Sequence, residues 1–406
     1  MKTMMIALMA FYLGLFLCSG VQAASEPGSV ENISPVSNPD TLLKTVLENN
    51  RLLRTARESF QVAVLEAGTG NTPPNPEVEF GYLFGKPAEM GNRIDFSVTQ
   101  QVDFPTTYIH RSRLKKLKTS RAELKYLATR QEVLLQAKQL WIERIFLNQQ
   151  AALLLTRLEQ ARRINSHQKQ KLESGEVGQL DFNQSNLQVA TLEGEYARVQ
   201  SQIRTNQLAI KEITGGFELD MDGSVFPSPV AMIADSLLEA YSMSPELQLR
   251  IHMQEFREEE KSVIAGENLP KLSAGYYSES VLDQNFKGFQ VGFTVPLWEN
   301  SNRIKKARSE VVLAEAEAER FTYLQQSELL QQLEQLASLK NRTAQLEEAL
   351  RAGNSMELLD LALESGEISL SEYYYSSGFH FRSQLLLLEY QRDLLLLEAS
   401  LLKVYL

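Results

Sequence analysis

The sequence predicts a mainly α-helical protein with a small β part, built as an internally duplicated chain of long coiled-coil helices and membrane-spanning strands. Three observations predict this fold class. A six-residue segment at positions 172–177 returns at positions 363–368, a pair of alternating apolar and polar runs interrupts each half, and very long helical stretches follow these pairs. Strands alternate with period two and helices with period 3.6, so the two kinds of segment are distinguishable by pattern.

The first 23 residues have the pattern of a signal peptide for export. Lys2 supplies a positive charge, residues 4–17 are apolar, and Val21-Gln22-Ala23 fits a small-residue cleavage site. No small residue precedes Cys18, which argues against lipidation and leaves it as an alternative. Cleavage would remove the one cysteine, so we expect the mature chain to be stabilised by packing or oligomerisation rather than by disulfides. Residues 24–39 form an N-terminal extension.

Charge and composition exclude two classes of protein. The chain carries 41 Lys and Arg against 51 Asp and Glu, a formal net charge of −10, so it lacks the basic footprint of a nucleic-acid binder. Its 43% hydrophobic residues supply enough apolar surface for a large core, which argues against a disordered chain.

The repeated segment indicates a duplicated half-molecule. Leu-Glu-Ser-Gly-Glu-Val at 172–177 and Leu-Glu-Ser-Gly-Glu-Ile at 363–368 are 191 positions apart, and Asp103-Phe104-Pro105 is offset by the same distance from Thr294-Val295-Pro296. A period this long is unlike that of solenoid repeats. The predicted parts are a first structural repeat at 40–213, an equatorial linker at 214–229 and a second structural repeat at 230–406.

Four strands are predicted from alternation, two in each repeat. They span about 76–86, 94–104, 270–280 and 288–298, the length that a tilted strand needs to cross a bilayer. The alternative is an ordinary soluble hairpin with one face on a core. The residues predicted to face lipid are Phe80, Tyr82, Phe96, Val98, Phe289, Val291 and Phe293.

Oligomerisation follows from the membrane interpretation. Four strands cannot close a barrel, and an open sheet edge would leave backbone groups unsatisfied in hydrocarbon. Three copies would supply twelve strands, enough for a closed barrel in outer-membrane lipid. We therefore expect a homotrimer.

The helical stretches have two lengths. The longer ones, at about 107–173 and 301–364, would span roughly 95–100 Å at 1.5 Å per residue. The shorter ones, at about 40–67, 180–213, 230–265 and 370–406, would reach about half as far and are expected to stack in pairs beside the long helices. A dimeric coiled-coil rod is the alternative, but it does not account for the strand pairs.

Taken in order, these features resemble the TolC family, the outer-membrane channel components of tripartite efflux pumps and type I secretion. The resemblance rests on the duplicated strand pair before a proline, on Val295-Pro296-Leu297-Trp298 running into Asn302-Arg303, and on the two Ser-Gly-Glu turns. It implies a trimeric α/β barrel in the outer membrane of a Gram-negative bacterium, extending into the periplasm. A periplasmic adaptor protein and an inner-membrane pump of the RND or ABC type are the implied partners.

The resemblance also implies where the pore narrows. The family's constriction lies six and nine residues after the glycine of the second turn, which here gives Glu372 and Tyr375; the counterpart of Glu372 in the first repeat is Asp181. Glu372 matches the family's acidic residue and Tyr375 departs from it. Alternatively, Glu372 is a solvated acid that the dipole of its helix favours at the N-terminus.

The turns themselves are the implied contact with the adaptor. The residues concerned are Gly175 and Glu176 in the first turn and Gly366 and Glu367 in the second. A turn of this kind needs the permissive backbone of glycine. The neighbouring residues differ from the Val-Gly-Leu sequence of some family members.

Motifs for chemistry are absent from the sequence. No nucleotide-binding or hydrolase motif occurs, and His110, His167, His252 and His380 lack the spacing of metal ligands. We therefore predict no enzyme and no cofactor. The predicted function is a passive export duct of a tripartite efflux system. A periplasmic coiled-coil scaffold or adaptor without a pore is the alternative. The short length and the Asn75-Pro76-Glu77 opening resemble the family's heavy-metal cation branch. Metal cations are therefore one expected class of substrate, and drugs are the alternative.

Overall fold

Helices and antiparallel strands alternate along the part of the chain that the computed structural model describes. This part is residues 39–406 without 220, 222–224, 229–232, 283, 297, 299–301 and 354. The predicted signal peptide, Cys18 and nearly all of the 24–39 extension lie outside it, as do Leu297 and parts of the predicted linker. The described residues belong to a single unit, residues 35–406.

The helices are α1 (Pro39–Asn49), α2 (Arg51–Ala67), α3 (Pro105–Glu173), α4 (Gln179–Ile213), α5 (Ala234–Ser242), α6 (Pro245–Glu267), α7 (Arg303–Ala352), α8 (Ser355–Ser365) and α9 (Leu370–Leu401). The strands are β1 (Glu77–Leu83), β2 (Arg93–Val102), β3 (Lys271–Val281) and β4 (Gln284–Thr294). Short 3₁₀ helices lie at Ala88–Met90 and Leu402–Tyr405. The prediction of a mainly helical protein with a small antiparallel sheet is confirmed.

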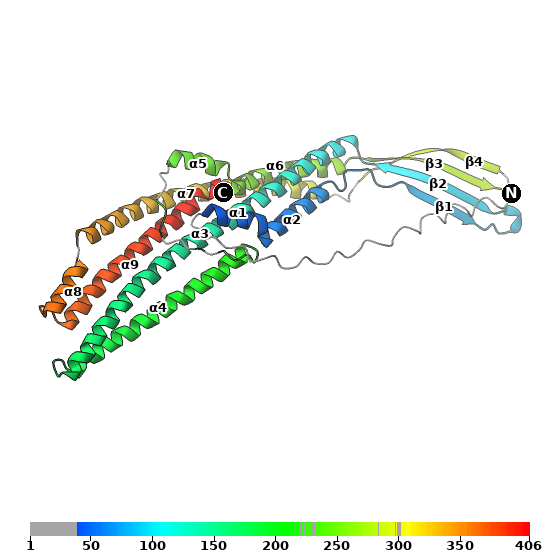
Figure 1. Cartoon of the computed structure of the whole chain (residues 1–406). Helices are drawn as coiled ribbons and strands as arrows, with labels where there is room; N and C mark the ends of the chain where they lie inside the picture. The colour runs from blue at the N-terminus through cyan, green and yellow to red at the C-terminus, as the bar shows by residue number, and fades with distance from the viewer. Residues whose placement is uncertain are drawn as a thin grey trace. The chain divides into compact units, whose positions relative to one another are not determined.

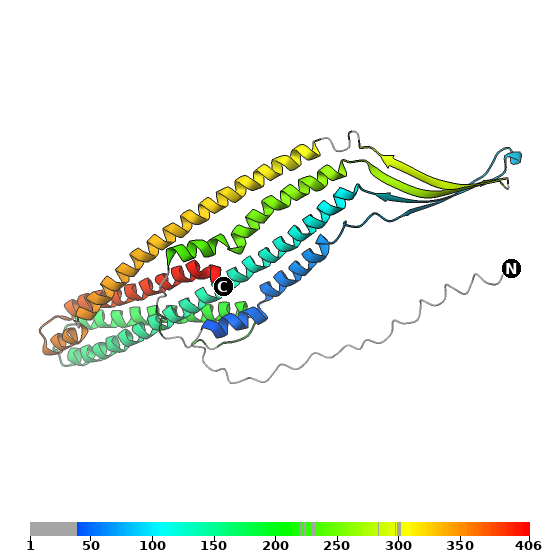
Figure 2. The same cartoon turned by 90° about the horizontal axis from the view of Figure 1, so that it is seen from above.

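The strands form one sheet in the order β1-β2-β3-β4, with every neighbouring pair antiparallel. The β2–β3 pair joins segments far apart in the sequence, and Val98 lies opposite Tyr276. Figures 1 and 2 show that α2 and α6 lead into this sheet and that α3 and α7 leave it.

Three predicted strand ends need correction. β4 begins at Gln284 rather than 288. Val281 of β3 already pairs with Gln284, so the polar residues that open β4 belong to the strand although they do not follow the alternating pattern. It ends at Thr294 rather than 298, just before Val295-Pro296, since proline has no N–H for a ladder. β1 ends at Leu83 rather than 86, ahead of Pro87.

The 69-residue helix α3 has shorter helices beside both of its halves. Along its first half it packs on α2 and α6, as the stacked Phe60 and Tyr126 rings and the Arg121–Phe256 contact show. Along its second half it packs on α4 and α9. The long helix α7 packs on α6 and then on α9. Figures 1 and 2 show these helices running alongside one another.

Three predicted helical stretches are broken in the structure, and each break has a local cause. The stretch predicted at 40–67 divides at Asn50, whose side chain caps α2. The stretch predicted at 230–265 divides at Ser244, which caps α6, with Pro245 at the first helical position. The stretch predicted at 301–364 is not one helix: α7 ends at Ala352, and Gly353 has the non-helical angles φ −107° and ψ 88°.

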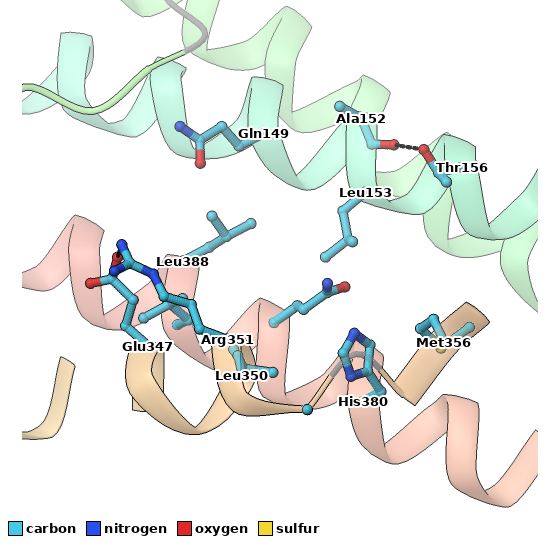
Figure 3. Close-up of a pocket in the computed structure, with 13 residues that line it drawn as sticks. Gln149, Ala152, Leu153, Thr156, Glu347, Leu350, Arg351, Met356, His380 and Leu388 are labelled. Carbon is cyan, nitrogen blue, oxygen red and sulfur yellow. Dashed lines mark hydrogen bonds and ion pairs between the residues drawn. The ribbon is translucent and has the colours of Figure 1, made fainter. Parts of the chain in front are cut away.

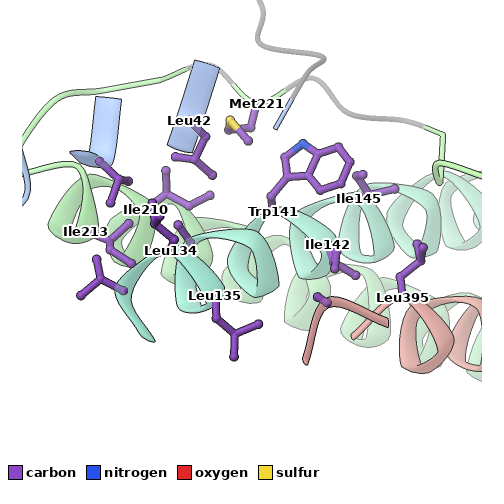
Figure 4. Close-up of a cluster of buried hydrophobic side chains, with 14 of the residues drawn as sticks. Leu42, Leu134, Leu135, Trp141, Ile142, Ile145, Ile210, Ile213, Met221 and Leu395 are labelled. Carbon is purple, nitrogen blue, oxygen red and sulfur yellow. The ribbon is translucent and has the colours of Figure 1, made fainter. Parts of the chain in front are cut away.

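The largest buried cluster lies midway along α3. Trp141, Ile142 and Ile145 pack there against Leu42 of α1 and Ile210 of α4. Figure 4 shows Met221, from the segment after α4, between Leu42 and Trp141. Burying a side chain of this size contributes about 1.5–3 kcal/mol. The cluster therefore fixes the level at which the shorter helices meet.

An ion-pair chain joins the ends of strands and helices from both halves. Arg111 of α3 binds Asp103 at 2.8 Å and Glu267 at 3.1 Å, and Glu267 also binds Arg303 of α7 at 3.2 Å. Because the guanidinium of Arg111 serves two carboxylates, it ties the end of β2 to the end of α6.

Candidate functional site: the two Ser-Gly-Glu turns and the exposed sheet face

The first predicted turn ends α3 in a Schellman motif. Gly175 has φ +80°, its N–H donates to Leu172 O at 3.1 Å, and the N–H of Glu176 donates to Lys171 O at 2.8 Å. Nothing lies within 4 Å of a Cβ built on Gly175, so glycine is needed there for its backbone angles and not for space. The turn is exposed.

The second turn has the same construction. Gly366 has φ +76°, its N–H donates to Leu363 O at 3.3 Å, and the N–H of Glu367 donates to Ala362 O at 2.9 Å. Ser174 and Ser365 also match, because each hydroxyl donates to the carbonyl three residues earlier. The repeated Ser-Gly-Glu sequence therefore gives two exposed ends of one shape.

Glu372 lies in the first turn of α9, where it completes a capping box with Ser369. The Glu372 N–H donates to Ser369 Oγ at 3.2 Å, and the Ser369 N–H donates to Glu372 Oε2 at 2.9 Å. Hydrogen bonds from the backbone and then the hydroxyl of Ser369 hold the pKa of Glu372 below its usual value. The carboxylate is thus ionised at neutral pH and exposed.

The three tyrosines that follow have three different environments. Tyr373 is 2% exposed and its hydroxyl donates to Asp360 Oδ1 at 2.7 Å, whereas Tyr375 is 77% exposed. Burial and then the hydrogen bond to Asp360 raise the pKa of Tyr373 far above its usual value. Burial alone raises the pKa of Tyr374 to about 12, and its hydroxyl has no partner among the described residues. Of these three side chains, that of Tyr375 is the exposed one.

Asp360 and Gln184 connect the helices near the turns. Asp360 of α8 accepts hydrogen bonds from Tyr373 and, at 2.6 Å, from Gln160 of α3. Ser371 of α9 donates to Gln184 of α4 at 3.1 Å. Asp181, half-buried in the first turn of α4, lies three residues before Gln184. The structure therefore brings the start of α4 and the start of α9 together, and sequence patterns gave no sign of the Asp360 contacts.

A hollow of about 690 Å³ lies beside the break between α7 and α8. Figure 3 shows Leu153 of α3, Leu350 of α7 and His380 of α9 around it. A second hollow of about 610 Å³ shares His380 and includes Tyr375 and Phe379. Gly353, which separates α7 from α8, lines both hollows.

The sheet has one apolar face, and all seven strand residues predicted to face lipid lie on it. The register sets Phe80 opposite Phe96, and Val98 opposite Tyr276, which lies opposite Phe289. Phe289 is 92% exposed, an extreme value for such a side chain. The other face is polar and carries Arg93, which binds Asp95 at 2.9 Å and Glu279 at 3.2 Å.

The described residues contain neither a membrane-spanning helix nor a cluster of metal ligands. None of their helices combines the length and the apolar character needed to cross a bilayer. Within the same residues, histidine, cysteine and acidic side chains nowhere gather in threes as a metal site would require.

Comparison with solved structures shows the fold. CusC, whose crystal structures concern transmembrane channel formation, matches with a TM-score of 0.73 and 14% identity, over 95% of this chain and 99% of CusC. The CmeC outer membrane channel of Campylobacter jejuni matches with a TM-score of 0.73 and 15% identity, over 96% of this chain and 94% of CmeC. The outer membrane protein VceC of Vibrio cholerae matches with a TM-score of 0.74 and 13% identity, over 90% of this chain and 95% of VceC.

No protein-family model matches the chain, and no curated protein matches it. The likeness to CusC, CmeC and VceC extends over nearly the whole length of each protein. The chain therefore has the fold of these channel proteins.

Proposed function

We propose that this chain is one protomer of an outer-membrane channel of the TolC family, the export duct of a tripartite efflux system in a Gram-negative bacterium. The shared fold with CusC and CmeC supports the proposal, as does the sequence resemblance to the family. The chain would act as a passive conduit, and a periplasmic adaptor and an inner-membrane pump of the RND or ABC type would supply selection and energy.

The observation that carries the proposal is the exposed apolar face of an incomplete sheet. Phe289, Val291 and Phe293 are each more than 70% exposed on one face of β4. In the described residues β1 and β4 each pair on one side only. Lipid would cover the apolar face, and β1 of one copy would pair with β4 of the next, since an open edge is not tolerated in hydrocarbon. Three copies would close a twelve-stranded barrel with a helical barrel below it.

The proposed constriction lies at the start of α9 and α4. In a trimer, Glu372 would supply three carboxylates around the axis, and its capping box keeps each one ionised at neutral pH. Rings of acidic side chains favour cations. Tyr375, exposed one turn further along α9, and Asp181 of α4 would complete the narrow part.

The two turns are the proposed contact with the adaptor. Gly175 and Glu176 in one, and Gly366 and Glu367 in the other, are exposed and share one backbone shape. Two turns in each of three copies would present six similar ends, which suits a repeated partner.

The test uses the full mature chain, fractionated from a Gram-negative host and inserted into planar bilayers. We expect outer-membrane localisation and cation-preferring channels, with lower cation preference and higher conductance for Glu372→Gln. Glu176→Gln is the matched control, because it removes an exposed acid outside the proposed constriction. A chain that stays in the periplasmic fraction and forms no channel would contradict the proposal and favour a scaffold. Sensitivity of a deletion strain to metal cations and to drugs would assign the substrate.

A further inference from the structure

Side chains from three helices face the hollow beside the break between α7 and α8. Its lining includes positions 149, 153 and 156 of α3 and positions 380, 384 and 387 of α9, which are three or four residues apart and so share one side of each helix. Leu350 of α7 and Gly353 complete it. Its volume of about 690 Å³ falls within the range of about 300–1,000 Å³ that is usual for sites of small organic molecules. We call this hollow the break site.

The break site lies inside one chain and not at an outer edge. In this half of the described unit α9 packs on both α3 and α7, and α4 packs on α3. Figure 1 shows α9 and α3 between α7 and α4. A second copy placed beside this one would therefore meet α4 or α7, which leaves the break site free for a small molecule.

Most of the lining is apolar, and its acidic and basic residues are paired. Leu153, Leu350 and Leu388 are half-buried, and Figure 3 shows Leu153 pointing into the space between the helices. Glu347 and Arg351 form an ion pair with each other at 2.5 Å. Because their charges compensate, the break site suits an uncharged organic molecule and not a metal ion.

One polar atom of the lining lacks a partner. The Oε1 atom of Gln384 is buried and accepts no hydrogen bond from any described residue. His380, one turn earlier on α9, has its ring against Phe381 and makes no hydrogen bond within the described part of the chain. A buried acceptor that stays unpaired is destabilising. An N–H or O–H on a bound molecule would satisfy Gln384 and remove this cost.

The second hollow connects the break site to the proposed constriction. Both hollows include Leu350, Gly353 and His380, and the second also includes Tyr375. On α9 the second hollow takes positions 375, 379 and 383, which lie on a different side of the helix from positions 380, 384 and 387. Figure 3 shows His380 at the break itself. A molecule in the break site is therefore next to a space that Tyr375 lines.

We propose that the break site binds an uncharged amphipathic organic molecule, with an N–H or O–H that donates to Gln384 and an apolar body against Leu153, Leu350 and Leu388. Gly353 makes room for it, because the chain leaves the helix there and carries no side chain. Binding itself does not depend on the proposed function. That such molecules are exported compounds, held beside the constriction, rests on the proposed function.

The test measures energy transfer from Trp141 to a fluorescent aromatic amine, N-phenyl-1-naphthylamine. Trp141 is buried, and Leu153 follows it by about 18 Å along α3. The start of α3 at the sheet is about 54 Å away in the other direction, so probe dissolved in lipid is remote from this donor. Trp298→Phe removes the other tryptophan from every sample. The full mature chain is held in lipid nanodiscs and titrated with the probe.

Two variants test the lining and the acceptor. Leu153→Glu places a charge in the apolar part, and Gln384→Leu removes the acceptor while keeping a side chain of similar size. Because the replaced acceptor is buried and unpaired, Gln384→Leu should not destabilise the fold, and circular dichroism checks both variants. Gln170→Leu is the matched control, because Gln170 is exposed on α3 near the first Ser-Gly-Glu turn and does not line the break site. Competition with 1-naphthylamine and with 1-methylnaphthalene, which has no donor, tests the hydrogen bond.

We expect saturable energy transfer, with an affinity that Leu153→Glu lowers at least about tenfold, since an apolar molecule would then lie against a charge. Gln384→Leu should weaken the binding of both amines about three- to tenfold, as the loss of one hydrogen bond predicts. It should leave the binding of 1-methylnaphthalene unchanged or tighter, and Gln170→Leu should resemble the unmodified chain.

Transfer that does not saturate, or that neither variant changes, would overturn the break site. Equal weakening of the amines and of 1-methylnaphthalene by Gln384→Leu would overturn the role of its amide oxygen. Channels that form in planar bilayers without this binding would overturn the inference and leave the proposed function standing. Binding by a chain that forms no channel would keep the site and contradict the proposed function.

Discussion

Asn50 and Ile213 join the beginning of α2 to the end of α4 through one buried side chain. Asn50 Nδ2 donates to the backbone oxygen of Ile213 at 2.7 Å, while Asn50 Oδ1 accepts from Leu53 N at 2.9 Å. A single residue therefore caps one helix and satisfies a carbonyl that the other helix leaves unpaired. The contact lies where α1, α2 and α4 meet beside α3.

Replacing Asn50 should weaken this junction. Asn50→Ala removes the cap and leaves the Ile213 carbonyl buried without a donor, so we expect a loss of about 2–3 kcal/mol in the free energy of unfolding. Chemical denaturation of the detergent-solubilised chain, followed by circular dichroism, measures it. Asn49→Ala is the matched control, because the Asn49 side chain donates to Thr45 O within its own helix. Equal stability of the two variants would show that the junction is unimportant.

The three tyrosines of α9 should respond differently to loss of their hydroxyls. Tyr373→Phe removes one of the two side-chain hydrogen bonds to Asp360 and should cost about 1–2 kcal/mol, with faster amide exchange in α8. Tyr374→Phe should be neutral or stabilising, because its buried hydroxyl has no partner among the described residues. Tyr375→Phe should leave stability unchanged, because that side chain is exposed. A uniform response of the three would contradict the assigned environments.

The capping box of α9 should be sensitive to acid. The pKa of Glu372 is lower in the folded chain than in the unfolded one, so its contribution is present above the ordinary glutamate pKa and is lost as pH falls through the folded value. We expect Ser369→Ala to speed amide exchange in the first turn of α9 at pH 7, and to have a smaller effect once Glu372 is protonated, because the bond from the Ser369 hydroxyl to the carboxylate depends on its charge whereas the bond from the Glu372 N–H to Ser369 Oγ does not. A variant effect that is the same at both pH values would contradict this coupling.

Ser369→Ala also separates the two roles of Glu372. It removes the cap and keeps the charge, whereas Glu372→Gln removes the charge and keeps a side chain that can complete a capping box. In planar bilayers we expect Glu372→Gln alone to reduce cation preference. If Ser369→Ala reduced it equally, Glu372 would act through the helix end and not as a constriction.

Gly266 should be intolerant of a side chain. A Cβ at this position would lie 2.5 Å from Thr107 Oγ1, so Gly266→Ala should cost about 1–3 kcal/mol of stability by forcing α6 away from α3. Adding Thr107→Ala should recover part of the loss in a double-mutant cycle. Gly194→Ala on α4 is the control: nothing lies within 4 Å of its Cβ, and it should stabilise the helix. Additive effects at Gly266 and Thr107 would refute the contact.

Much of the fold followed from pattern. Alternation placed on one face of the sheet all seven residues predicted to face lipid, and the two Ser-Gly-Glu segments predicted the helix ends at Gly175 and Gly366. These features depend on neighbouring residues, which is why sequence shows them. The strand start at Gln284 did not follow, because pairing with β3 and not side-chain pattern sets it.

The helix breaks and the contacts near the two Ser-Gly-Glu turns were not predicted, for different reasons. Ser244-Pro245 and Ser369-x-x-Glu372 are capping sequences that could have been read directly. The Asn50–Ile213 and Asp360–Gln160 contacts join residues 163 and 200 positions apart, so only the folded chain brings them together. The same holds for the burial of Tyr373 beside an exposed Tyr375.

The mass of the full mature chain extracted from bacterial envelopes tests the central claim most directly. The apolar sheet face and the two open edges predict that the chain is recovered from the outer-membrane fraction with detergent, at the mass of three copies. Recovery of a single copy in the aqueous periplasmic extract, without detergent, would contradict the account.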